Sequence, residues 1–168
     1  MTKKEIIMKR VLSLVGVLLL ALLVTGCGNS TSEEKVEKDT YVADIEGAQL
    51  EATFSHVGDN LRKVEQTMVY PMSYLGYEEG EKLDDATKKK LTEQVEAQYS
   101  EYKDGEGTSL ETKFTDDGLE LTMTVDLYKA DASAISSLLG GGSTDPKNIS
   151  YKETIADFES QGFKKKES

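Results

Sequence analysis

The stretch LELTMTVDL at residues 119–127 decides the fold, because apolar and polar residues alternate in it without interruption. A period of two predicts a β-strand that buries one face and exposes the other. The preceding segment, LETKF at residues 110–114, ends in the turn Asp116-Asp117-Gly118. Two such segments joined by a short turn predict a β-hairpin.

A similar pattern occurs 60 residues earlier in the chain. The segment LEATF at residues 50–54 matches residues 110–114, and Gly58-Asp59-Asn60 supplies the turn. A helix follows each predicted hairpin, one capped by Asp84 or Asp85 and a shorter one near residues 131–139. A ββα unit repeated twice is one interpretation of this order. A chance similarity between two hairpins is the other.

The last predicted element is a helix whose end the sequence defines. Tyr151, Ile155 and Phe158 form a stripe along one side of it. Gly162 stands where a left-handed cap belongs, which makes Phe158 and Phe163 the two residues that touch in a Schellman ending.

These patterns predict an α+β fold. We expect an antiparallel sheet of about four strands with helices packed on one face and a threonine-rich face open to water. The sheet would be built from the two ββα units, with the C-terminal helix added, in a single domain at residues 42–168.

The N-terminus has the parts of a secretory signal peptide. Basic residues precede an uncharged run at residues 11–24, which is shorter than the ~20 residues that cross a bilayer comfortably. The run ends in Val24-Thr25-Gly26-Cys27, which resembles the lipobox of bacterial lipoproteins. The resemblance implies that Cys27 receives a diacylglyceryl group and that cleavage removes residues 1–26. An uncleaved anchor, or a signal peptide with an incidental cysteine, is the alternative.

Lipidation of Cys27 would hold the chain on the extracytoplasmic face of the cell membrane through its lipid alone, with residues 27–41 as a disordered tether. Cys27 is the only cysteine, which excludes disulfides, CxxC redox chemistry and a cysteine zinc site. Removal of residues 1–26 takes away four basic residues and one acidic residue, so the formal charge changes from −11 to −14. Such a surface repels nucleic acid. A surface of this charge suits solubility, or the attraction of a cationic partner or of metal ions.

Several features follow one another in a fixed order along the chain. They are the lipobox, the short tether, residues 50–70 with their Gly-Asp turn, a Lys/Glu-rich helix, a second hairpin and the terminal Phe158-Glu159-Ser160-Gln161-Gly162-Phe163. This order resembles the YehR-like family of small bacterial lipoproteins over nearly all of the chain after the cleavage site. The resemblance implies the fold and the location, and it supplies no catalytic residues.

The sequence offers few groups for catalysis. His56 is the only histidine, and its place in the alternating segment favours a packed strand end over a catalytic base or a zinc ligand. The pairs Asp84-Asp85 and Asp116-Asp117 fall at a helix start and a turn, whereas glycoside hydrolysis needs one buried acid with a raised pKa. We therefore predict no enzyme, no cofactor and no metal site. A carboxylate-dependent hydrolase of the cell envelope is the alternative.

The candidate binding surface is an apolar loop that contains Tyr70, Tyr74, Leu75 and Tyr77. Tyrosine combines a flat apolar ring with a polar tip, which suits contact with a ligand or a partner. Capping of the core is the other interpretation of these residues. The predicted function is a monomeric, membrane-anchored, non-catalytic binding or accessory module. Its partner would be an envelope protein or a cationic ligand, and a structural or assembly role is a further alternative.

Overall fold

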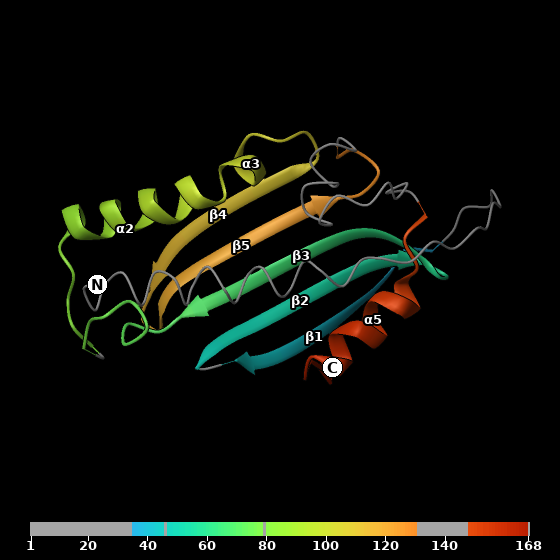
Figure 1. Cartoon of the computed structure of the whole chain (residues 1–168), viewed down its shortest axis with the longest axis horizontal. Coiled ribbons are helices and arrows are strands. Elements are labelled where there is room, and N and C mark those ends of the chain that lie inside the picture. The colour runs from blue at the N-terminus through green and yellow to red at the C-terminus, as the bar shows by residue number, and fades with distance from the viewer. Residues whose placement is uncertain (1–34, 46, 79, 131–147, 168) are drawn as a thin grey trace.

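The computed structural model describes residues 35–45, 47–78, 80–130 and 148–167. Within these ranges the chain forms one antiparallel sheet of six strands in the order β4-β5-β3-β2-β1-β6 (Figure 1). The strands are β1 (Glu37–Ile45), β2 (Ala48–Val57), β3 (Asn60–Tyr70), β4 (Thr108–Thr115), β5 (Gly118–Asp126) and β6 (Lys164–Lys165). The helices of the described part are α2 (Asp85–Gln98), α3 (Ser100–Lys103) and α5 (Tyr151–Ser160).

Both predicted hairpins are present in the sheet. β2 and β3 pair on either side of the turn at Gly58-Asp59, and β4 and β5 pair on either side of Asp116-Asp117. The hairpins join through their second strands, since β3 pairs with β5 and places Met68 opposite Leu121. The strand with the cleanest alternation therefore lies inside the sheet. The short helix predicted near residues 131–139 lies outside the described residues.

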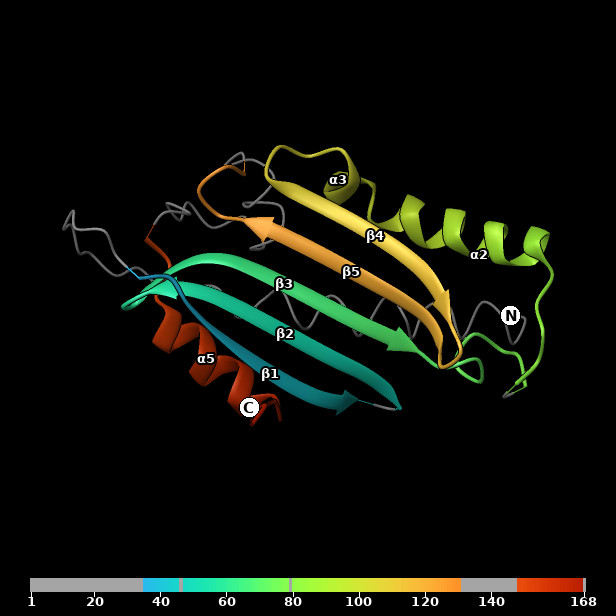
Figure 2. The same cartoon turned by 180° about the vertical axis from the view of Figure 1, so that it is seen from behind.

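The predicted sheet of about four strands with helices on one face is wrong. β1 and β6 extend the sheet beyond β2, while α2 lies along the outer strand β4 and has no buried residue (Figure 1, Figure 2). In β1 only Tyr41 is buried, and β6 consists of two exposed lysines. Because strands near an edge bury little, they lack the alternation that reveals central strands. β1 begins at Glu37, inside the segment that we predicted as a tether.

One face of the sheet carries the hydrophobic core. Alternate residues of β2, β3 and β5 are buried there, among them Leu50, Ala52, Phe54, Met68, Tyr70, Leu119, Leu121 and Met123. The ring of Phe158 on α5 meets the ring of Phe54 edge to face, with centroids 4.9 Å apart. Tyr102 of α3, a helix that contacts β4 and β5, is buried in the same core.

The predicted Schellman ending of α5 is confirmed. The N–H of Phe163 donates to the carbonyl oxygen of Phe158 at 3.1 Å, and the N–H of Gly162 donates to that of Glu159 at 3.0 Å. Gly162 has a φ of 97°, and the rings of Phe158 and Phe163 have centroids 4.9 Å apart. The chain therefore reverses after α5 and pairs with β1 as β6.

We expect Gly162→Ala to lower the free energy of unfolding by about 1 kcal/mol, because a side chain disfavours the positive φ. An added Cβ at this position meets no atom within 4 Å, so the backbone conformation alone sets the cost. Urea unfolding of the full chain, followed by circular dichroism, measures the change.

Gly118→Ala is the contrasting variant for this measurement. Gly118 has a φ of 141°, and an added Cβ would collide with the carbonyl oxygen of Tyr70. We expect a loss of at least about 2 kcal/mol, since both the conformation and the overlap oppose the methyl group. Equal losses for the two variants would contradict the purely conformational role assigned to Gly162.

Candidate functional site

The face of the sheet opposite the core is lined by polar side chains, and we call it the open face. The hydroxyl oxygens of Thr40 on β1 and Thr53 on β2 are hydrogen-bonded at 2.9 Å. Those of Thr67 on β3 and Thr122 on β5 are hydrogen-bonded at 3.2 Å. Both are directly opposed cross-strand pairs. The open face is thus an ordered polar surface on which side-chain hydrogen bonds join neighbouring strands.

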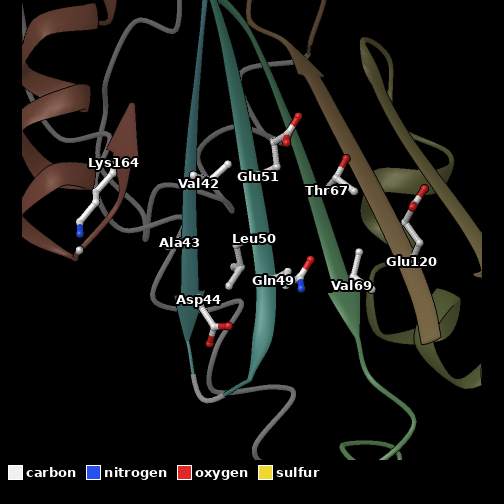
Figure 3. Close-up of a pocket in the computed structure, with 11 residues that line it drawn as sticks. Val42, Ala43, Asp44, Gln49, Leu50, Glu51, Thr67, Val69, Glu120 and Lys164 are labelled. Atoms are coloured by element: carbon white, nitrogen blue, oxygen red, sulfur yellow. The ribbon is translucent and has the colours of Figure 1, made fainter. Parts of the chain in front are cut away.

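A hollow of about 820 Å³ crosses four strands of the open face, β1, β2, β3 and β5 (Figure 3). Its open-face side chains are Val42, Asp44, Gln49, Glu51, Thr67, Val69 and Glu120, and Gly162 and Lys164 lie at its β1 edge. The strand register explains this set. Asp44, Gln49, Val69 and Glu120 are successive partners across the strands, as are Val42, Glu51 and Thr67. The hollow therefore consists of two adjacent cross-strand rows.

A second hollow of about 250 Å³ adjoins the first, since Gln49 and Val69 line both. It extends to Pro71 and Met72 after β3 and to Asp116-Asp117 between β4 and β5. We call the two hollows together the sheet groove. The carboxylate pair Asp116-Asp117, which the sequence singles out, thus lies at one end of the groove.

Carboxylates of the sheet groove already hold ammonium groups of the chain itself. Glu51 Oε2 accepts a hydrogen bond from Lys166 Nζ at 2.6 Å, and Glu120 Oε1 lies 2.7 Å from Lys113 Nζ. The side chains of Lys166 and Glu51 are 54% and 42% exposed, and exposed pairs of this kind contribute roughly 0–1 kcal/mol. The ion pair between Lys166 and Glu51 therefore contributes little to stability.

A second polar cluster, which we call the Asp39 junction, lies towards the start of β1. Asp39 Oδ1 accepts from Lys165 Nζ at 2.6 Å, while Oδ2 accepts from Tyr151 OH at 2.5 Å and lies 3.2 Å from His56 Nε2. The hydrogen bond from Lys165, aided by those from Tyr151 and His56, outweighs burial and lowers the pKa of Asp39 to about 2. Burial, followed by the hydrogen bond to Asp39, raises the pKa of Tyr151.

The Asp39 junction has a structural role. His56 is 4% exposed, its ring stacks on that of Tyr151 with centroids 3.6 Å apart, and its Nδ1 lies 2.8 Å from the Gly58 carbonyl oxygen. A buried and stacked imidazole does not meet a substrate that arrives from solvent. The junction instead ties β1 and β2 to α5 and β6, in agreement with the packed strand end predicted for His56.

The structure buries the residues of the predicted tyrosine surface to different degrees. Tyr70 is buried in the core, where burial raises its pKa, and Tyr74 and Leu75 pack half-buried against the core. Tyr77 is half-buried in the turn that follows. Core capping therefore accounts for the packing of the first three. A binding role for Tyr74, Leu75 and Tyr77 stays a prediction.

The remaining predicted positions fall at helix starts or outside the described residues. Asp84 caps α2, since its Oδ1 accepts from the N–H of Thr87 at 2.7 Å. Cys27 and the cleavage motif Val24-Thr25-Gly26-Cys27 lie outside the described ranges.

Within the described ranges, no three His, Cys, Asp or Glu residues gather as ligands for a metal ion. The helices that the structure describes all lack the length and apolar character needed to span a membrane.

Acid should weaken the fold through Asp39. The pKa of the Asp39 carboxyl is about 2 in the folded chain, against an ordinary value of 3.8. The ionised carboxylate therefore stabilises the fold fully above about pH 4, and this stabilisation is lost as the pH falls towards 2. This shift corresponds to roughly 2 kcal/mol. Unfolding free energies at pH 5 and pH 2.5 should differ less in Asp39→Asn than in the wild type.

The control for the acid experiment is Asp117→Asn, which removes an exposed carboxylate in a turn. This variant should keep the wild-type pH dependence. If Asp39→Asn also kept it, the assigned hydrogen bonds would not be the source of acid sensitivity.

Comparison with known families supports the fold. The family model described as "Protein of unknown function (DUF1307)" matches residues 37–164. The match begins at the first residue of β1 and ends at the first residue of β6, so it covers all of the sheet except Lys165. The predicted resemblance to the YehR-like family is confirmed.

Two solved structures share this fold. The NMR structure of the E. coli YehR protein has a TM-score of 0.61 and 20% sequence identity, and the match covers 80% of this chain and 93% of that chain. The NMR structure of a protein from Streptococcus pneumoniae TIGR4 has a TM-score of 0.50 and 17% identity, and the match covers 86% and 93%. No curated protein matches the chain.

Proposed function

This chain belongs to the DUF1307 family, and we propose that it is a lipid-anchored, non-catalytic binding module on the extracytoplasmic face of the cell membrane. The observation that carries the binding role is the sheet groove, a hollow in an ordered polar face. The family is one of unknown function, so membership assigns no catalytic activity to this chain.

The chemistry of the groove supports binding. The Gln49 amide and the Thr67 hydroxyl offer hydrogen bonds, and Val42 and Val69 offer apolar contact beside them. All four side chains stand on strands whose opposite face is fixed by the core, so their positions are set before a ligand arrives. Glu51 and Glu120 face lysines.

The N-terminal sequence supports the anchor. Residues 28–36 separate Cys27 from the first residue of β1, and these nine residues reach at most about 32 Å when fully extended. A diacyl group on Cys27 would bind a bilayer stably, because two chains are enough for a lasting anchor. On this proposal the groove works close to the membrane surface.

Cys27→Ala should abolish the anchor. We expect wild-type cells fed a labelled fatty acid to incorporate the label into this protein and to retain it in the membrane fraction. The variant should take up no label, because the alanine side chain offers no sulfur for acylation. Ser30→Ala is the matched control and should behave as the wild type. If Cys27→Ala still incorporated the label and stayed in the membrane fraction, the proposed lipid anchor on Cys27 would be contradicted.

The binding role is tested by a photo-crosslinking residue in place of Thr67, at the centre of the groove. In intact cells it should yield a discrete adduct, because its side chain lies where the ligand is proposed to bind. The same residue in place of Glu93, an exposed position on α2, should yield none. Adducts at both positions, or at neither, would argue against the groove as the binding site.

A further inference from the structure

We propose that the sheet groove binds a lysine-rich extended segment of a partner polypeptide. This inference rests on the proposed binding function and adds the chemistry of the ligand. It is carried by the charge of the groove and by the way in which the chain's own lysines already lie against it.

The strand β6 is an internal precedent for such a ligand. Lys164 pairs with Val42 of β1 and lines the groove, and Lys166 places its Nζ 2.6 Å from Glu51 Oε2. The backbone N–H of Lys166 donates to the carbonyl oxygen of Thr40 at 2.8 Å. Lys165, between them, points away from the groove and contacts Asp39. An extended segment with alternating lysines is therefore the kind of chain that this edge already accommodates.

The carboxylates of the groove are spaced for more than one lysine. Asp44 and Glu120 stand at opposite ends of one cross-strand row, three strand spacings apart, which is about 14 Å at the usual distance between strands. Glu51 lies between them in the adjacent row. In an extended segment, residues two and four positions apart are about 7 and 13 Å apart. Two or three lysines on one side of such a segment can therefore reach these carboxylates together.

Apolar side chains lie between the charged ones. Val42 and Val69 are open-face residues of the groove, and they offer contact to the methylene stem of a lysine while its ammonium reaches a carboxylate. The formal charge of the whole chain, −11, favours the approach of a basic ligand and opposes an acidic one. Charge and surface therefore select the same class of ligand.

The proposal predicts competition between the ligand and β6. Lys166 pairs with Glu51 and Lys113 pairs with Glu120 in the free chain, so a basic segment that binds both carboxylates must displace both lysines. Removal of the Lys166 side chain should consequently strengthen binding. Lys63, which pairs with Glu65 on the same face but outside the groove, supplies a control that removes the same charge.

The test uses the full lipidated chain in non-ionic detergent micelles and the probe peptide acetyl-Lys-Thr-Lys-Thr-Lys-amide. Titration at about 0.15 M salt, where long-range charge effects are screened, is followed by NMR. The largest chemical-shift changes should fall on residues that line the sheet groove. The double variant Glu51→Gln, Glu120→Gln should weaken binding about tenfold, since each lost pair contributes up to about a factor of five. Lys166→Ala should tighten it about threefold.

The matched control for the double variant is Glu65→Gln with Glu111→Gln. These residues share the open face but do not line the groove, and the pair removes the same charge. The site would be supported if this control pair weakened peptide binding less than about twofold and Lys63→Ala changed the affinity little. Equal effects in the groove and control variants, or no binding, would overturn the proposal. Tighter binding of the free triamine spermidine than of the peptide would overturn the polypeptide ligand.

Failure of this test is separable from failure of the proposed function. A specific adduct at Thr67 in cells, together with no binding of the basic peptide, would leave the binding module in place and refute only the ligand chemistry. No adduct at Thr67 would refute the binding function itself.

Discussion

The structure depends on a sheet that buries only one of its two faces. Successive side chains of a strand point to opposite faces, so each residue that enters the core sends its neighbour to the open face. Leu50 is buried and Glu51 faces the groove, just as Met68 is buried between Thr67 and Val69. The packing of Phe158 on Phe54 covers part of the buried face and leaves the other face open.

The parts of the fold that could be predicted are those with local signals. The two hairpins follow from alternation and turns, and the end of α5 follows from Gly162 and two phenylalanines. β1 and β6 could not be predicted, because strands near an edge bury few residues and show no period. The strand order could not be predicted either. It results from the pairing of β3 with β5, which are separated in the sequence by two helices and the strand β4.

The sheet groove shows why the candidate site was harder to predict than the fold. Asp44, Gln49, Val69 and Glu120 come from four different strands, and each resembles an ordinary exposed strand residue in the sequence. Only the register brings them into one row. The tyrosine loop gave a stronger sequence signal, yet Tyr70 serves the core. Asp116-Asp117 was recognised as a pair, but its position at the end of the groove depends on the sheet order.

The complete pairing of β1 with β2 has a mechanical consequence. Nine consecutive residue pairs join the two strands from Glu37 to Ile45, and β1 is the first strand in the part of the chain that the structure describes. A pull along β1 from that end loads the hydrogen bonds of this ladder in shear, so they resist together instead of breaking one by one. Asp39, close to the point where the pull enters, passes part of the force to α5 and β6. The sheet is therefore built to stay folded under tension from its N-terminal side.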